Sequence, residues 1–277
     1  MFSPFGFMKT QAGGGGGDAD ATAYINAVIT AGGSFSGVEE TAIDTFYVNL
    51  KSSGIYNKLF AMYPYMGGTS TSNAINATNP GTYDLAFNGT WAHSVSGSYT
   101  TPANTNYGET SYNVLTNSVY TTASFSLGYQ INNPITSTPY CYMGVGSGAS
   151  YLLVGWHYPN SIDTYYPNGV PISGQWNSGG HFNLVSRTAT NSWFGGKIIS
   201  GESASGGLTK TATQTSTYTT IANKSVWINN INGTNLPMGG RHTFAFIGQG
   251  LSTGETDTLM IEMNTMFDSF TNRKLFT

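Results

Sequence analysis

The chain has 277 residues, of which 8% are charged and 14% are aromatic, and its formal net charge is −3. Ordinary globular proteins have about 25% charged residues, so this surface must consist largely of uncharged polar side chains, while the aromatic residues supply a core. The small net charge and the lack of a basic run exclude the electrostatic footprint of a nucleic-acid partner. No stretch approaches the roughly 18 consecutive apolar residues of a membrane span, so we expect no membrane partner.

The first part of the chain, residues 1–17, divides into an aromatic head and a glycine tether. Five consecutive glycines at 13–17 have no side chains to bury and high backbone entropy, which predicts a flexible tether. The head is too short for a core, and its apolar residues predict a peptide that docks on another protein. The expected docking residues are Phe2, Phe5, Phe7 and Met8. The alternative is a fraying terminus with chance aromatics.

Residues 18–62 are expected to form two or three short helices. Asp18 and Asp20 suit a helix N-terminus, and Ser36 with Glu39 forms a capping box. The apolar residues that follow at helical spacing are Ile43, Phe46, Tyr47 and Leu50, continued after a break by Ile55, Leu59 and Met62. Helices this short need a packing partner. The turn-rich segment 63–82 is expected to be a loop linker.

Residues 83–277 are expected to form an antiparallel β-sandwich closed by a C-terminal helix at 253–272. Short β-rich runs occur at 123–131, 140–144, 151–156, 181–187, 192–199, 225–229 and 241–248. Helical crossovers are missing between them, which excludes a doubly wound parallel sheet. The single cysteine, Cys141, lies in one of these runs, so we expect a buried, inert thiol and no disulfide framework. Ser252 and Glu255 form a second capping box before the apolar stripe of the last helix.

Several short motifs occur in an order that resembles a known module. They are residues 63–69, 91–94, 110, 186–188, 232–233 and 244–252. In this order they resemble the laminin-G-like or concanavalin-like jelly-roll module of tailed-phage virion proteins, particularly from phages of Bacteroidota and crAss-like phages. The likeness spans residues 18–275. Gln249 stands where an acidic residue is expected, and Gly195 with Gly196 where an Asn-Gly turn is usual, but both departures concern turns.

The resemblance implies a structural component of a phage virion: a head fibre, a capsid-attached decoration or a tail appendage. Its partners would be capsid, portal-proximal or tail proteins, and it would reside in the virion after assembly in the host cytoplasm. Because many phage fibres are trimeric, a homo-oligomer is expected, and a trimer is favoured over a dimer. The resemblance supplies no catalytic residue.

The sequence also predicts that the chain is not an enzyme. Glycoside hydrolases need two neighbouring carboxylates, whereas the acids between 83 and 250 are solitary: Asp84, Glu109, Asp163 and Glu202. The four histidines are scattered singly, which predicts no metal site; His93, beside Trp91, is expected to serve packing or hydrogen bonding. The glycine-rich stretch 144–149 precedes a strand rather than a helix, so no dinucleotide cofactor is expected.

A receptor- or glycan-binding module of a phage fibre is the alternative function. Sugars bind to aromatic platforms beside polar groups, and several aromatic residues fall in or beside expected loops. These residues are Trp156, Tyr158, Tyr165, Tyr166 and Trp176. The competing interpretation is that they form sandwich-edge or oligomer contacts; either way, exposed aromatic residues mark an interface.

Overall fold

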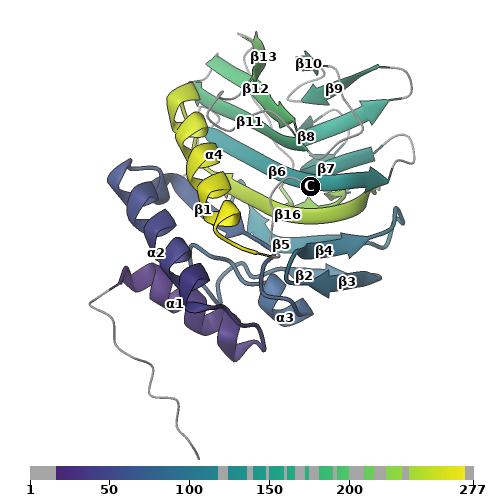
Figure 1. Ribbon diagram of the computed structural model, residues 1–277. Coiled ribbons are helices and arrows are strands. Elements are labelled where there is room, and N and C mark those ends of the chain that lie inside the picture. Colours follow the sequence, from purple (N-terminus) through teal and green to yellow (C-terminus); the bar gives the residue numbers. More distant parts are fainter. Residues whose placement is uncertain are drawn as a thin grey trace, which may run out of the picture.

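The chain folds into a β-sandwich with helices packed along one side (Figure 1). The computed structural model describes residues 17–117, 124–135, 140–147, 150–158, 161–165, 172–174, 181–189, 192–199, 209–214, 223–232 and 237–271. The helices are α1 (Ala19–Thr30), α2 (Gly37–Ser52), the short 3₁₀ helix η1 (Tyr56–Lys58), α3 (Ser70–Asn73) and α4 (Thr253–Asp268). None of these described helices has the length and apolar composition needed to cross a bilayer.

Two sheets, called A and B below, make up the sandwich. Sheet A contains β13 (Thr209–Gln214), β12 (Ser192–Ile199), β11 (His181–Ala189), β6 (Phe125–Ile135), β16 (Gly239–Gly248), β4 (Gly97–Thr100) and β3 (Trp91–Ser94) in that spatial order, and β1 (Leu59–Tyr63) also pairs with β16. Sheet B contains β10 (Ile172–Gly174), β9 (Ser161–Tyr165), β8 (Ser150–Tyr158), β7 (Tyr140–Ser147), β14 (Ser225–Ile228), β5 (Tyr107–Asn113) and β2 (Ala86–Asn88), and β15 (Ile231–Asn232) pairs with β7. All described pairings are antiparallel except that of β15 with β7. The prediction of an antiparallel, concanavalin-like sandwich with helices before and after it is confirmed.

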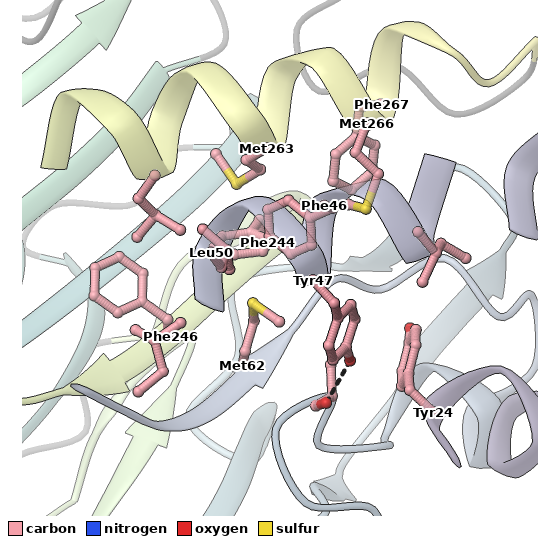
Figure 2. Packing of buried hydrophobic residues seen from close by; sticks show 14 of the residues in the cluster. Tyr24, Phe46, Tyr47, Leu50, Met62, Phe244, Phe246, Met263, Met266 and Phe267 are labelled. Atoms are coloured by element: carbon pink, nitrogen blue, oxygen red, sulfur yellow. Dashed lines mark hydrogen bonds between the residues drawn. The ribbon is translucent and has the colours of Figure 1, made fainter. Parts of the chain in front are cut away.

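Two hydrophobic clusters lie on opposite faces of sheet A. The alternating residues of β6 that include Leu127 and Tyr129 belong to the cluster between the sheets. The other cluster lies between sheet A and the helices, where Phe244 and Phe246 of β16 meet Phe46 and Met263 (Figure 2). Sheet A is therefore a middle layer, covered by sheet B on one side and by helices on the other.

A glycine in β6 lets the helix-side cluster approach the sheet closely. A Cβ atom on Gly128 would lie 2.0 Å from Cε1 of Phe246 and 2.8 Å from Cζ of Phe182. Those two rings are stacked, with centroids 6.3 Å apart and an interplanar angle of 14°. Gly128 thus supplies the space in which two large aromatic rings lie flat against the strand.

The helices begin where the sequence places their caps. The Asp18 side chain accepts hydrogen bonds from the first turn of α1, and Ser36 with Glu39 forms the predicted capping box of α2. The capping box of Ser252 and Glu255 likewise begins α4. Each cap satisfies backbone N–H groups that the helix itself leaves without a partner.

The prediction for the end of the helical segment 18–62 is wrong. Leu59 and Met62 were expected to continue a helix, but residues Leu59–Tyr63 form strand β1, which pairs with β16. The strand is buried on both faces, because Met62 packs under the helices and Tyr63 packs between the sheets. A short apolar run buried on both sides has no periodicity that separates strand from helix. The expected loop at 63–82 also contains the one-turn helix α3.

Candidate functional site

The sequence-predicted aromatic residues lie partly on neighbouring strands of sheet B. Trp156 and Tyr158 are in β8, where the backbone of Trp156 lies opposite Thr164 of β9 and that of Tyr158 opposite Ser161. Tyr165 ends β9. Trp156 is therefore inside a strand rather than in a loop, whereas Tyr158 and Tyr165 are at strand ends. Two of the predicted aromatics, Tyr166 and Trp176, and the docking residues Phe2, Phe5, Phe7 and Met8 lie outside the described residues.

The outer face of sheet B carries a second aromatic group that sequence reasoning missed. Burial alternates along β5 and β14, so that Val226 and Ile228 point into the sandwich while Ser225 and Trp227 are partly exposed. In β5, Tyr107, Glu109 and Asn113 are partly exposed and Ser111 is exposed; the first two lie nearest Trp227. Because alternate residues of a strand point to opposite faces, Tyr107, Glu109, Ser225 and Trp227 share the face of sheet B that points away from sheet A.

The rings of Tyr107 and Trp227 are stacked across the two strands. Their centroids are 3.8 Å apart and their planes differ by 11°. Trp227 lies opposite Glu109 on β5 and opposite Gly144 on β7. Gly144 contributes no side chain beside the indole.

Polar side chains beside this stack are held by mutual hydrogen bonds. The Ser225 hydroxyl donates to Oε1 of Glu109 at 2.8 Å, and Nδ2 of Asn232 donates to the Ser225 hydroxyl at 3.1 Å and to its carbonyl oxygen at 3.0 Å. These contacts fix the carboxylate, the hydroxyl and the amide next to the rings. We call Tyr107, Glu109, Ser225, Trp227 and Asn232 the β5–β14 patch.

A backbone irregularity brings Ser225 within reach of Glu109. In the register Ser225 lies opposite Asn113, yet Trp227 lies opposite Glu109, so β5 contains extra residues between the two pairs. One of them, Ser111, has a φ of 53°. A bulge shortens the distance along a strand and re-aims its side chains. Here it gathers side chains that a regular ladder would keep apart.

Asp84, a second acid of the sandwich region, binds backbone groups. Oδ1 of Asp84 accepts from the Asn76 N–H at 2.7 Å, and Oδ2 accepts from the Gly81 N–H at 3.1 Å. Both oxygens are thus used to hold a loop. Asp163 lies in β9, and Glu202 lies outside the described residues.

A third aromatic group lies at β2 and β3, the last strands in the order of the two sheets. The ring of Phe87 is 5.0 Å from Trp91 and 4.6 Å from His93, measured between centroids. Nδ1 of His93 is 3.0 Å from the hydroxyl of Ser98, and partial burial lowers its pKa. The interpretation of His93 as a packing and hydrogen-bonding residue is confirmed.

Behind this group lies a fully buried histidine, His242. A register shift between His242 and Phe244 interrupts the alternation of β16, so the imidazole lies 5.0 Å from Trp91 and 5.5 Å from Tyr129. Neither ring nitrogen has a hydrogen-bond partner among the described residues. Burial lowers the pKa of His242 to about 3, so the ring is neutral at physiological pH.

The possible metal ligands and the single cysteine of the described residues are the next groups of interest. Within those residues no three His, Cys, Asp or Glu side chains come together as a metal site would require. The Cys141 thiol is buried, its Sγ lies 3.5 Å from the carbonyl oxygen of Met143, and burial raises its pKa, as expected for an inert thiol.

Comparison with known proteins shows the fold. The sequence matches no protein-family model and no curated protein. A mutant of Trypanosoma rangeli sialidase that displays trans-sialidase activity is similar to the chain with a TM-score of 0.52 and 11% identity, over 81% of this chain and 39% of the sialidase. The same sialidase in complex with sialic acid gives a TM-score of 0.51 and 10% identity over the same shares.

A second kind of protein shares the fold. Botulinum neurotoxin type C is similar to the chain with a TM-score of 0.51 and 14% identity, over 76% of this chain and 53% of the toxin chain. Cell entry of that toxin depends on interaction with two ganglioside molecules. The chain thus spans about two fifths of the sialidases and about half of the toxin chain. These similarities place the described residues in a β-sandwich fold that lectin-like domains also use.

Proposed function

We propose that this chain is a non-enzymatic component of a phage virion appendage and that its β-sandwich binds a neutral glycan at the β5–β14 patch. The observation that carries the glycan part is the stack of Tyr107 and Trp227 beside the hydrogen-bonded Glu109, Ser225 and Asn232. An aromatic ring packs on the C–H face of a pyranose, while carboxylate, hydroxyl and amide groups bond to its hydroxyls. The patch offers both kinds of group within one face of one sheet.

The charge of the patch selects the class of glycan. Glu109 is its charged member, and a carboxylate repels the carboxylate of a sialylated sugar while accepting hydrogen bonds from neutral hydroxyls. The fold is shared with proteins that bind sialic acid or interact with gangliosides, which supports glycan binding but not that choice of sugar. Neutral hexose- or pentose-containing glycans fit the patch better.

Binding to a single patch on a partly exposed sheet face should be weak. An oligomer would present several patches, and the effective concentration of the second and later contacts would raise the overall affinity without any new contact. The expected homo-oligomer, with a trimer favoured, therefore suits a glycan-binding appendage. Sedimentation of the purified protein at micromolar concentration would test this, and a monomer would count against it.

The glycan proposal is tested by binding to an array of neutral and sialylated glycans. Trp227→Ala should weaken binding to the best neutral glycan by at least about tenfold, as expected for the loss of an interfacial tryptophan. Tyr99→Ala is the matched control, because Tyr99 is an exposed aromatic residue of sheet A. Loss of binding in Trp156→Ala but not in Trp227→Ala would move the site to β8 and β9, and no binding by the wild type would reject the proposal.

The non-enzymatic and virion parts need separate tests. Incubation of bound oligosaccharides should release no new reducing ends, and hydrolysis abolished by Glu109→Gln or Asp163→Asn would overturn the non-enzymatic assignment. Mass spectrometry of purified phage particles should detect the chain. Its absence from particles would reject the virion assignment while leaving the glycan-binding result intact.

A further inference from the structure

An apolar groove runs between α2 and α4 on the helix side of the molecule. It has a volume of about 380 Å³, within the roughly 300–1,000 Å³ of typical ligand sites. Its apolar lining includes Val38, Ala42 and Phe46 of α2 and Met266 of α4. Phe46 and Met266 also belong to the buried cluster drawn in Figure 2, so the bottom of the groove is formed by side chains that are packed in the core. The Val38 side chain, at one edge of the groove, is 67% exposed.

The described chain begins against α2, the helix that forms one wall of this groove. Asp18, which follows the glycine tether, donates its backbone N–H to the carboxylate of Asp44 on α2, and its side chain pairs with Lys51 at 2.7 Å. Asp44 is one helical turn from Thr41, which lines the groove. The base of the tether is therefore fixed to the same helix that forms one wall of the groove.

The segment on the other side of the tether has the matching chemistry. Residues 2–8 contain three Phe and one Met, and Lys9 follows them. The groove offers an apolar floor, and Glu262 of α4 lies in its lining. The Glu262 carboxylate accepts from Nδ2 of Asn49 at 2.6 Å, which holds it in place. The eight residues between Met8 and Gly17 can span up to roughly 28 Å, several times the length of one helical turn.

We propose that residues 2–9 bind in the α2–α4 groove of their own chain, with the phenylalanine rings on Phe46 and Met266 and Lys9 beside Glu262. A short flexible tether gives its peptide an effective concentration of about millimolar, so the segment occupies its own groove before that of a second copy. The contact shields the aromatic head in the free protein. A virion protein that takes up the head must displace it from the groove, which lowers the apparent affinity of the docking step.

Binding of a fluorescent peptide with the sequence of residues 1–12 tests the groove. The peptide should bind the full-length variant Phe2→Ser/Phe5→Ser/Phe7→Ser at least about tenfold more tightly than the wild type, whose groove is occupied. Adding Val38→Glu to that variant should weaken binding about tenfold. Val48→Glu is the matched control, because Val48 is an exposed valine of the same helix outside the groove lining. Equal binding to wild type and variant, or equal effects of the two glutamates, would overturn the proposal.

Disulfide trapping tests which copy supplies the segment. The variant Thr10→Cys/Thr45→Cys is treated with oxidised glutathione. The native Cys141 is buried and should not compete for disulfide formation. The expected product is an intrachain disulfide that forms at least about fivefold faster than the one in Thr10→Cys/Val48→Cys. This difference in rate should disappear when Phe2, Phe5 and Phe7 are replaced by Ser. Equal rates, or interchain dimers as the main product, would overturn binding within the same chain.

Discussion

The outer faces of the two sheets differ in what covers them. In β16 of sheet A, Phe244 and Phe246 point to the helices while Ala245 and Ile247 point to sheet B, so the strand is buried on both sides. In β5 of sheet B, buried and partly exposed residues alternate, and the exposed side carries Tyr107 and Glu109. A strand between two layers requires continuous apolar residues, whereas a strand with one solvated face can carry polar groups.

This difference assigns separate tasks to the two sheets. Sheet A joins the helices to the sandwich, and a change in its side chains should act on stability. Sheet B has a partly exposed face at the β5–β14 patch, and a change there should act on recognition and little on stability. The following predictions test that division, from the largest expected effect to the smallest.

The largest loss is expected in the helix-side cluster. Phe246→Ala removes a fully buried ring that stacks on Phe182 above Gly128. Because a large cavity would remain between the helices and sheet A, the free energy of unfolding should fall by about 3–5 kcal/mol. Chemical denaturation measures this, with the exposed Tyr99→Ala as a control expected within about 0.5 kcal/mol of the wild type. A loss below about 1 kcal/mol for Phe246→Ala would mean that the helices hardly depend on this contact.

The next effect is a pH dependence set by His242. Burial lowers its pKa to about 3, whereas an unfolded histidine has a pKa near 6.5. Between these values only the unfolded chain binds the proton, so stability rises with pH and falls on acidification by about 1.4 kcal/mol per unit below 6.5. From pH 7 to pH 5 the protein should lose roughly 2 kcal/mol through this group.

His242→Phe should remove that dependence. The neighbours of the ring are aromatic, and its nitrogens have no partner among the described residues, so a phenylalanine suits the site. Denaturation of wild type and variant at pH 7 and pH 5 gives the comparison, and His93→Phe, at a half-buried position, should retain most of the wild-type slope. An unchanged slope in His242→Phe would show that other groups titrate in this range.

On the partly exposed face of sheet B, Trp227→Ala should cost less stability than Phe246→Ala. The stack with Tyr107 is a cross-strand aromatic pair, worth about 0.5–1.5 kcal/mol beyond area burial. A double-mutant cycle with Tyr107→Ala and Trp227→Ala, followed by chemical denaturation, measures the coupling. A loss comparable to that of Phe246→Ala would contradict the division of tasks, because the patch would then be part of the structural core.

The sequence predicted those features of the fold whose signals lie close together in the chain. Capping boxes lie within four residues, so Ser36 and Ser252 placed their helices correctly. Alternation in 123–131 placed β6 and its inward face. The strand β1 escaped prediction because its identity depends on pairing with β16, almost 190 residues later in the chain.

The β5–β14 patch escaped for the same reason. Tyr107 and Trp227 meet only because β5 pairs with β14, and the Ser111 bulge sets which side chains share the face. The available signal was the alternation of Tyr107 and Glu109 with small residues, and of Ser225 and Trp227 with Val226 and Ile228. That pattern predicts two half-exposed strands, but it does not say that they are neighbours.

The smallest effect is expected from the ion pair between Lys58 of η1, which precedes β1, and Glu255 of α4. Nζ of Lys58 lies 2.5 Å from Oε1 of Glu255, at the first turn of α4. Partial burial by itself raises the pKa of Glu255, but hydrogen bonds from Lys58 and Ser252 outweigh it, so the pKa lies below its ordinary value of 4.5. A carboxyl with a lowered folded pKa stabilises the protein above the unfolded value, and this contribution disappears as the pH falls through the folded pKa.

Glu255→Gln isolates the charge, because an amide oxygen can still accept the Ser252 N–H in the capping box. Since both side chains are partly exposed and screened by solvent, the coupling with Lys58→Met in a double-mutant cycle should be about 0.2–1 kcal/mol at pH 7. It should shrink below pH 4.5 and in 1 M salt, where the screening length is about 3 Å. A coupling that persists in salt would mean that Lys58 and Glu255 are shielded from water more than their side-chain exposures of 32% and 24% indicate. The helix layer would then be held to sheet A by charge as well as by the apolar cluster, and the contrast between the two sheets would rest on more than burial.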